Sequence, residues 1–109
     1  MTPAVRSDET LSRITAALVA RLHPDAVFLF GSRARGDSAR SSDYDLLVVQ
    51  ATSELPGYQR DREALRALRD IRAAVDVIVL TRAEFEEARA CATSLVSTVL
   101  REGVALHAA

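Results

Sequence analysis

Two aspartates, Asp43 and Asp45, stand at the start of an apolar run that continues to Val49. If this run is a strand, side-chain alternation places both carboxylates on one face, with their Cα atoms roughly 6.5 Å apart. Two like charges at the mouth of a buried strand are costly unless a cation lies between them. Carboxylate oxygen is the ligand that Mg²⁺ prefers, so this spacing predicts a divalent metal site.

A third aspartate, Asp76, is set into a later apolar run at residues 75–80. If that run pairs with the strand that follows Asp45, one face of the sheet presents three carboxylates together. With two Mg²⁺ ions roughly 3.5–4 Å apart, such a cluster has the two-metal geometry used for in-line attack at phosphorus. The alternative is structural: Asp43 and Asp45 cap a turn, and Asp76 lies at an exposed strand end.

A glycine-containing, arginine-rich loop precedes the aspartate pair. Gly31 lets the backbone approach a ligand closely, and Ser32 offers a hydroxyl and an amide at the expected start of a helical turn. Arg33, Arg35 and Arg40 are available to neutralise phosphate. The loop lacks the lysine of a P-loop and the G-x-G-x-x-G of dinucleotide sites. A phosphate-binding turn followed by paired metal ligands indicates a nucleoside triphosphate site.

Composition excludes several classes of function. The 109 residues include no lysine, which removes Schiff-base chemistry, and the net charge of −1 gives no general attraction to nucleic acid or membrane. The single Cys91 excludes an intrachain disulfide framework and a thiolate zinc cluster. No apolar stretch reaches the roughly 18–20 residues of a membrane span, and no signal-peptide pattern is present, so we expect a cytoplasmic protein.

The elements that position these groups follow from hydrophobic periodicity. We expect an α+β (α/β) fold, with a small mixed β-sheet flanked by helices, and a single domain over residues 1–109. The predicted strands cover residues 26–30, 44–49, 75–80 and 104–106. The predicted helices cover residues 8–22, residues 61–74, a segment opened by a capping box at Thr81–Glu84, and, after a break at 91–94, a last helix from Leu95 to Gly103.

The helix predicted over residues 61–74 has two faces. Leu65, Leu68 and Ile71 are expected to face the core. Arginines occupy the other face, which we interpret as solvated, with a pair between Arg66 and Asp70. The alternative for this arginine face is contact with an acidic partner.

The combined motifs resemble a known signature. The run GSRARG at residues 31–36, followed by SDYDLL at residues 42–47, is similar to the polymerase-β-like nucleotidyltransferase superfamily. More closely, the chain resembles the minimal nucleotidyltransferases (MNT domains) of prokaryotic HEPN/MNT toxin–antitoxin pairs. The resemblance covers nearly the whole chain, including Asp76, and implies the polymerase-β-like nucleotidyltransferase fold. Tyr44 departs from it, because many relatives have a small aliphatic residue there; it should face the opposite side of the sheet and pack without a catalytic role.

The resemblance implies a role for each matching residue. The implied nucleotide-binding residues, with the first two on the β- and γ-phosphates of ATP, are Gly31, Ser32, Arg33 and Arg35. The implied catalytic and metal-binding residues, which would hold two Mg²⁺ ions, are Asp43, Asp45 and Asp76. The implied reaction transfers AMP from ATP to a hydroxyl, that of a tyrosine on a cognate HEPN ribonuclease toxin, which is thereby silenced.

Three functions remain open at this point. The leading one is a protein adenylyltransferase that acts as an antitoxin and forms a hetero-oligomer with its HEPN partner. The second is an antitoxin that neutralises the toxin by binding alone. The third is a small-molecule nucleotidyltransferase, such as one that modifies an aminoglycoside, and the short chain disfavours it. We expect no membrane association and no stable direct binding of nucleic acid.

Overall fold

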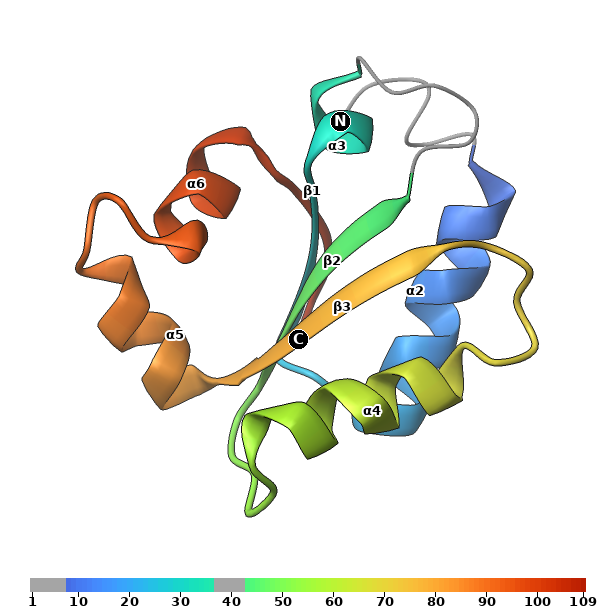
Figure 1. Cartoon of the computed structure of the whole chain (residues 1–109), viewed down its shortest axis with the longest axis horizontal. Coiled ribbons are helices and arrows are strands. Elements are labelled where there is room, and N and C mark those ends of the chain that lie inside the picture. The colour runs from blue at the N-terminus through green and yellow to red at the C-terminus, as the bar shows by residue number, and fades with distance from the viewer. Residues whose placement is uncertain (1–7, 37–42) are drawn as a thin grey trace.

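One four-stranded mixed sheet lies between two groups of helices in the computed structural model (Figure 1). The structure describes residues 8–36 and 43–109. The elements of those residues, in chain order, are α2 (Glu9–Leu22), β1 (Ala26–Phe30), α3 (Ser32–Arg35), β2 (Tyr44–Gln50), α4 (Gly57–Ala67), β3 (Val75–Thr81), α5 (Arg82–Arg89), α6 (Leu95–Glu102) and β4 (Val104–Ala108). The α+β fold class and the predicted order of elements are confirmed.

The strands are arranged in the order β3-β2-β1-β4. β1 pairs antiparallel with both β2 and β4, whereas β2 and β3 are parallel, with α4 in the connection between them. The two strands that carry the predicted catalytic aspartates are therefore neighbours, which is the pairing that a shared carboxylate face requires.

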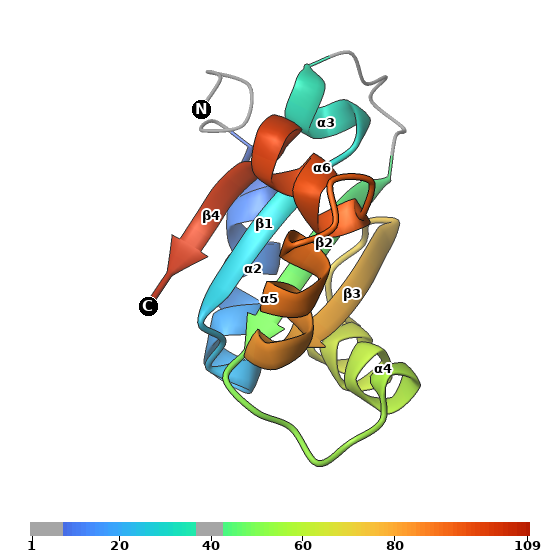
Figure 2. The same cartoon turned by 90° about the vertical axis from the view of Figure 1, so that its left-hand side faces the viewer.

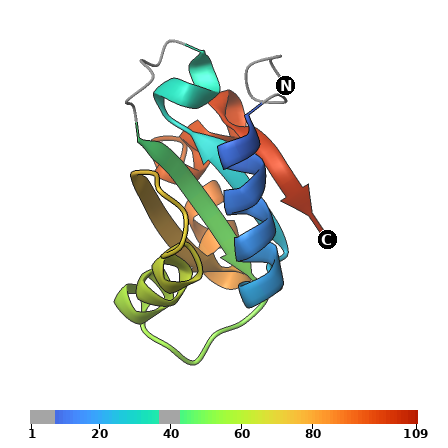
Figure 3. The same cartoon turned by 90° about the vertical axis from the view of Figure 1, so that its right-hand side faces the viewer.

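Alternation along β2 divides its side chains between two cores. Leu46 and Val48 pack on the face covered by α2 and α4, which Figure 3 shows in front of the sheet. Leu47 and Val49 pack with Phe85 on the face covered by α5 and α6, in front in Figure 2. The side chains of these four residues of β2 are fully buried. This strand is thus held rigidly from both sides, and so is the position of Asp45 at its start.

Side-chain caps mark the starts of α2 and α5. Asp8 accepts from the Leu11 N–H at 2.9 Å at the start of α2. Thr81 and Glu84 form the predicted capping box of α5, and the predicted break separates α5 from α6. Among the described residues, no helix has the length and apolar character that crossing a membrane requires.

Both predicted boundaries of the helix at residues 61–74 are wrong, since α4 runs from Gly57 to Ala67. Pro56 is its N-cap with an extended backbone, so the helix begins four residues before the predicted start. At the other end, the Leu68 N–H bonds to the Leu65 carbonyl at 3.0 Å, and the chain leaves the helix there.

The predicted faces of α4 change with its boundaries. Leu68 is buried as predicted, but Leu65 is 46% exposed. The face toward the core is instead the i, i+4 series that leads through Ala64 back to Arg60. Arg66 pairs with Glu63 at 2.8 Å, and the predicted Arg66–Asp70 helical pair does not form because Asp70 lies beyond the end of the helix.

Candidate active site

Asp45 and Asp76 lie directly opposite each other on the parallel strands β2 and β3. Phe30, at the end of β1, is opposite Asp45 on its other side, so the three residues form one row across the sheet. Register partners share a face, and here it is the face of α5 and α6. Asp43 immediately precedes β2, two residues before Asp45. The structure thus places Asp45 and Asp76 side by side, with Asp43 two residues before Asp45, and the catalytic role of all three stays a prediction.

The electrostatics of this row are unfavourable to an ionised Asp45. Burial raises the pKa of the Asp45 carboxyl above its ordinary value, and the negative charges of Asp76 and then Asp43 raise it further. The Arg35 guanidinium acts in the opposite direction. The site therefore carries an excess of negative charge that a cation would neutralise.

The donors of this row have the right chemistry for Mg²⁺, because all of them are carboxylate oxygens. Nowhere in residues 8–36 and 43–109 do three acidic, histidine or cysteine side chains already stand close enough to ligate one ion together. The fit to a metal ion therefore rests on the type of donor and on the repulsion between the carboxylates.

Gly31 lies against the Asp45 carboxylate. Its backbone has φ +75°, a conformation that side-chain-bearing residues rarely adopt, and a Cβ at this position would overlap Oδ2 of Asp45. The Gly31 carbonyl accepts from the N–H groups of Ala34 and Arg35 at 3.1 and 3.2 Å, which turns the chain into α3. The predicted phosphate-binding turn and the predicted metal-binding strand are consequently in direct contact.

The two arginines of α3 have different surroundings. Arg35 is close enough to Asp45 for its charge to act on that carboxyl. The Arg33 guanidinium lies over the Tyr44 ring, 3.9 Å from its centroid, and 3.8 Å from Oδ2 of Asp8. The Tyr44 hydroxyl donates to the same Asp8 oxygen at 2.8 Å. Arg33 thus holds α3 against Tyr44 and the start of α2. The charge of Arg35 acts instead on Asp45, which together with Asp43 and Asp76 we call the acidic row.

The remaining predicted residues differ in what the structure describes. Ser32 is the first residue of α3, so its N–H has no acceptor within that helix. Arg40 lies in residues 37–42, outside the described part of the chain. Tyr44 is buried on the face opposite to Asp45, as predicted, although its hydrogen bond to Asp8 and its contact with Arg33 were not. The nucleotide-binding roles of Ser32 and the arginines stay predictions.

An open pocket of about 640 Å³ adjoins the acidic row. Asp45 and Asp76 contribute to its wall, and Asp61 and Leu65 of α4 and Leu95 of α6 line it further. Pockets of this size are typical of small-molecule and cofactor sites. The carboxylates therefore lie where a ligand can reach them from solvent.

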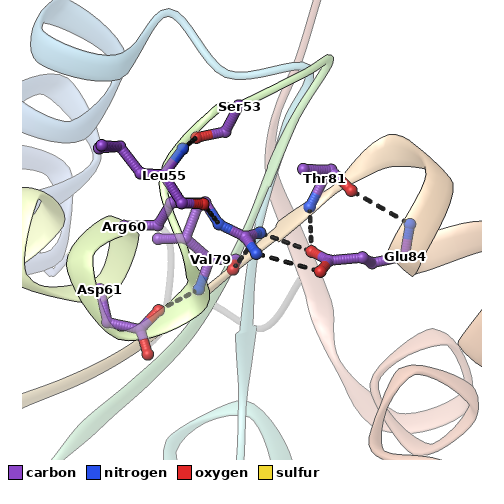
Figure 4. A network of polar contacts seen from close by, with 7 residues as sticks. All are labelled: Ser53, Leu55, Arg60, Asp61, Val79, Thr81 and Glu84. Atoms are coloured by element: carbon purple, nitrogen blue, oxygen red, sulfur yellow. Dashed lines mark hydrogen bonds and ion pairs between the residues drawn. The ribbon is translucent and has the colours of Figure 1, made fainter.

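A network of polar contacts joins α4 to α5 at the opposite end of β3 (Figure 4). Arg60, only 7% exposed, donates to the carbonyls of Leu55 and Val79, each at 3.1 Å. Its guanidinium also donates through Nη2 to Oε2 of Glu84 at 3.0 Å, and the Thr81 N–H donates to the same carboxylate at 2.9 Å. These hydrogen bonds, Arg60 first, lower the pKa of Glu84 to about 2. The network is a structural feature in which every polar partner is satisfied.

Known proteins are similar to this chain in sequence or in structure. The family model described as polymerase beta, nucleotidyltransferase matches residues 12–107. A crystal structure of a Sulfolobus solfataricus protein, provisionally named a nucleotidyltransferase, aligns with a TM-score of 0.64 and 27% identity over 94% of this chain and 80% of that one. No curated protein matches the chain.

Two toxin–antitoxin structures share the fold. One, determined with AMP-PNP, aligns with a TM-score of 0.64 and 23% identity over 90% of this chain and 73% of that chain. The other, a mutant of the toxin–antitoxin MntA-HpeT, aligns with a TM-score of 0.63 and 21% identity over the same shares. Since the family match spans almost all of the described residues, the chain belongs to the polymerase beta nucleotidyltransferase family.

Proposed function

We propose that this nucleotidyltransferase is a Mg²⁺-dependent, cytoplasmic antitoxin that transfers AMP from ATP to a hydroxyl, that of a tyrosine, on a HEPN ribonuclease toxin. The observation that carries the proposal is the contact of Gly31 with Asp45, in register with Asp76. The toxin–antitoxin proteins of the same fold, one of them determined with AMP-PNP, support the choice of partner and nucleotide.

In this proposal, α3 and the residue before it bind the triphosphate. Gly31 has no side chain, so phosphate oxygens can approach its backbone closely. Ser32 contributes its hydroxyl and its N–H, and Arg35 contributes positive charge next to the acidic row. Arg33 acts on the other side, where its stacking on Tyr44 keeps α3 in place.

Asp43, Asp45 and Asp76 would hold two Mg²⁺ ions. When bound, these ions neutralise phosphate charge and lower the pKa of the attacking hydroxyl. In the transfer itself, the acceptor oxygen forms a bond to the α-phosphorus and the bond to pyrophosphate breaks. Asp76, which is exposed at the edge of the sheet, receives the proton of the hydroxyl and passes it to water.

The test is transfer of label from ATP to the purified cognate HEPN protein in the presence of Mg²⁺. With ATP labelled at the α-phosphate, the wild-type chain should label the HEPN protein, and Asp45→Asn should not. Label at the γ-phosphate should leave with pyrophosphate, which separates nucleotidyl transfer from phosphorylation. Asp70→Asn is the matched control, because this exposed carboxylate lies outside the acidic row.

Two results would contradict the proposal. If wild type and Asp45→Asn silence the toxin equally in cells, inhibition depends on binding alone. If label appears on an aminoglycoside and on no protein, the acceptor is a small molecule.

A further inference from the structure

The edge strand β3 has its outward backbone groups satisfied over only part of its length. In the sheet formed by the described residues, β3 has no strand on its outer side. At Val79, Asp61 accepts from the N–H at 2.8 Å and Arg60 donates to the carbonyl at 3.1 Å (Figure 4). At Thr81, the N–H donates to Glu84 at 2.9 Å. Side chains of α4 and α5 thus take the place of a further strand at the end of β3.

These hydrogen bonds from side chains do not extend to Val77. Alternate residues of a strand turn their backbone groups to the same side, so Val77 directs its N–H and C=O outward like Val79. One turn after Asp61, α4 presents Leu65, a side chain without hydrogen-bonding groups. Within residues 8–36 and 43–109, no side chain forms a hydrogen bond with the backbone of Val77. Val77 as a whole residue is 7% exposed, and it reaches solvent where it and Val75 line the pocket beside Asp76. Its outward N–H and C=O thus have no hydrogen-bonding partner among the described residues, and we call this first half of β3 the open edge.

The open edge is continuous with the acidic row. Val75 and Val77 line the same pocket as Asp45 and Asp76. The other wall residues include Leu65 and Leu95, which are 46% and 40% exposed. Cationic side chains are absent from the described wall of this pocket, whereas three of its residues are aspartates. The pocket fits an extended backbone with apolar side chains and with neutral or basic, not acidic, character.

We propose that the acceptor protein binds as an extended segment that adds a strand to β3 at Val75–Val77. This rests on the proposed function, because the segment supplies the hydroxyl that receives AMP. Main-chain hydrogen bonds to Val77 give affinity, and side chains at alternate positions give specificity. A residue opposite Asp76 in an added antiparallel strand has its Cβ atom about 5 Å away on the same face, which brings its hydroxyl to the acidic row.

Amide hydrogen exchange followed by NMR tests the pairing directly. In the free chain, the Val77 amide should exchange faster than that of Ile78, which faces β2, and that of Val79, which is bound to Asp61. Addition of the cognate HEPN protein should slow exchange at Val77 by about tenfold or more and change Val79 little. A complex that forms without protecting Val77 would overturn the proposal. So would protection that rises with the concentration of this chain alone, because a second copy would then occupy the edge.

A pair of exposed leucines provides the matched variants. Leu65→Arg places a long cation over the open edge, whereas Leu100→Arg changes a similarly exposed leucine, 43% against 46%, that does not line the pocket. Leu65→Arg should raise the KM for the HEPN protein about tenfold, equivalent to about 1.4 kcal/mol, and should weaken the protection of the Val77 amide by the HEPN protein. Leu100→Arg should match wild type in both measurements.

The outcomes separate the two proposals. If Leu65→Arg behaves like Leu100→Arg while the wild type labels its partner, edge pairing is wrong and the proposed function stands. If the wild type transfers no AMP although Val77 becomes protected, the docking surface stands and the transfer is wrong.

Discussion

The two ends of β3 have carboxylates in opposite surroundings. Where β3 begins, burial and two neighbouring carboxylates raise the pKa of Asp45, and Arg35 opposes them only in part. Where β3 ends, Arg60 and a backbone N–H lower the pKa of Glu84 to about 2. One end is electrostatically satisfied by the fold itself, whereas the other has negative charge in excess. Such an imbalance in an accessible pocket is typical of a functional site, since the fold gains nothing from it.

The largest expected effect comes from removing charge at the unsatisfied end. Asp45→Asn should lower the rate of AMP transfer at least 100-fold, because metal-type charge stabilisation contributes several kcal/mol. The same substitution should leave the melting temperature unchanged or raise it, since it removes a repelled carboxylate. Calorimetry and the labelling assay measure the two effects. A fall in melting temperature with AMP transfer retained would show that Asp45 has a structural role and no catalytic one.

At the satisfied end, the effect should be on stability alone. Arg60→Met leaves the carbonyls of Leu55 and Val79 and the Glu84 carboxylate without their donor, and should cost about 2–4 kcal/mol of unfolding free energy. Arg62→Met is the control: this residue is exposed on the same helix, and its substitution should cost less than about 0.5 kcal/mol. Urea titration gives both values, and the transfer rate per folded molecule should remain at the wild-type level.

A double-mutant cycle sharpens the picture of the unsatisfied end. Gly31→Ala forces a side chain into a positive-φ backbone conformation (φ 75°, ψ −159°) that is essentially restricted to glycine, and into the Asp45 carboxylate, so it should cost more than the roughly 1–3 kcal/mol of the conformation alone. In an Asp45→Ala background the overlap is removed, and the cost of Gly31→Ala should be smaller by at least about 0.5 kcal/mol. Equal costs in the two backgrounds would show that the contact has no energetic weight.

The smallest expected effect is on acid stability. The folded-state pKa of Glu84, about 2, is below its ordinary value of 4.5, so its stabilising contribution is present above pH 4.5 and is lost as the pH falls toward 2. The contribution of Asp45 to stability has the opposite sign. Because the pKa of Asp45 is raised in the folded state, this residue stabilises the fold below pH 3.8, its ordinary pKa, and the stabilisation is lost as the pH rises through the folded-state pKa. In EDTA, Glu84→Gln should therefore flatten the acid decline in melting temperature, and Asp45→Asn should steepen it.

Much of the fold can be predicted from local patterns. β1 is a short apolar run between Pro24 and Gly31, and the capping box at Thr81 and Glu84 is encoded within four residues. The meeting of Asp45 with Asp76 could also be predicted, because an aspartate set into the apolar run of each of two strands is costly unless the two share a cationic partner.

The tertiary roles of polar side chains could not be predicted in the same way. Arg60 lies among arginines that are exposed, and only its spacing to Ala64 and Leu68 indicates that it faces inward. Because the helix is predicted to begin at residue 61, Arg60 lies outside the predicted helix and this spacing does not enter the prediction. Tyr44 has a buried side chain whose hydroxyl partner, Asp8, is 36 residues earlier in the chain, and no local pattern connects them.

The contact between Gly31 and Asp45 has a consequence for protein engineering. Because the carboxylate occupies the volume that any side chain at residue 31 would need, the glycine turn and the aspartate strand form one unit. Chimeras that exchange only one of these segments with a relative will combine parts with mismatched spacing, whereas those that exchange both together retain the fit.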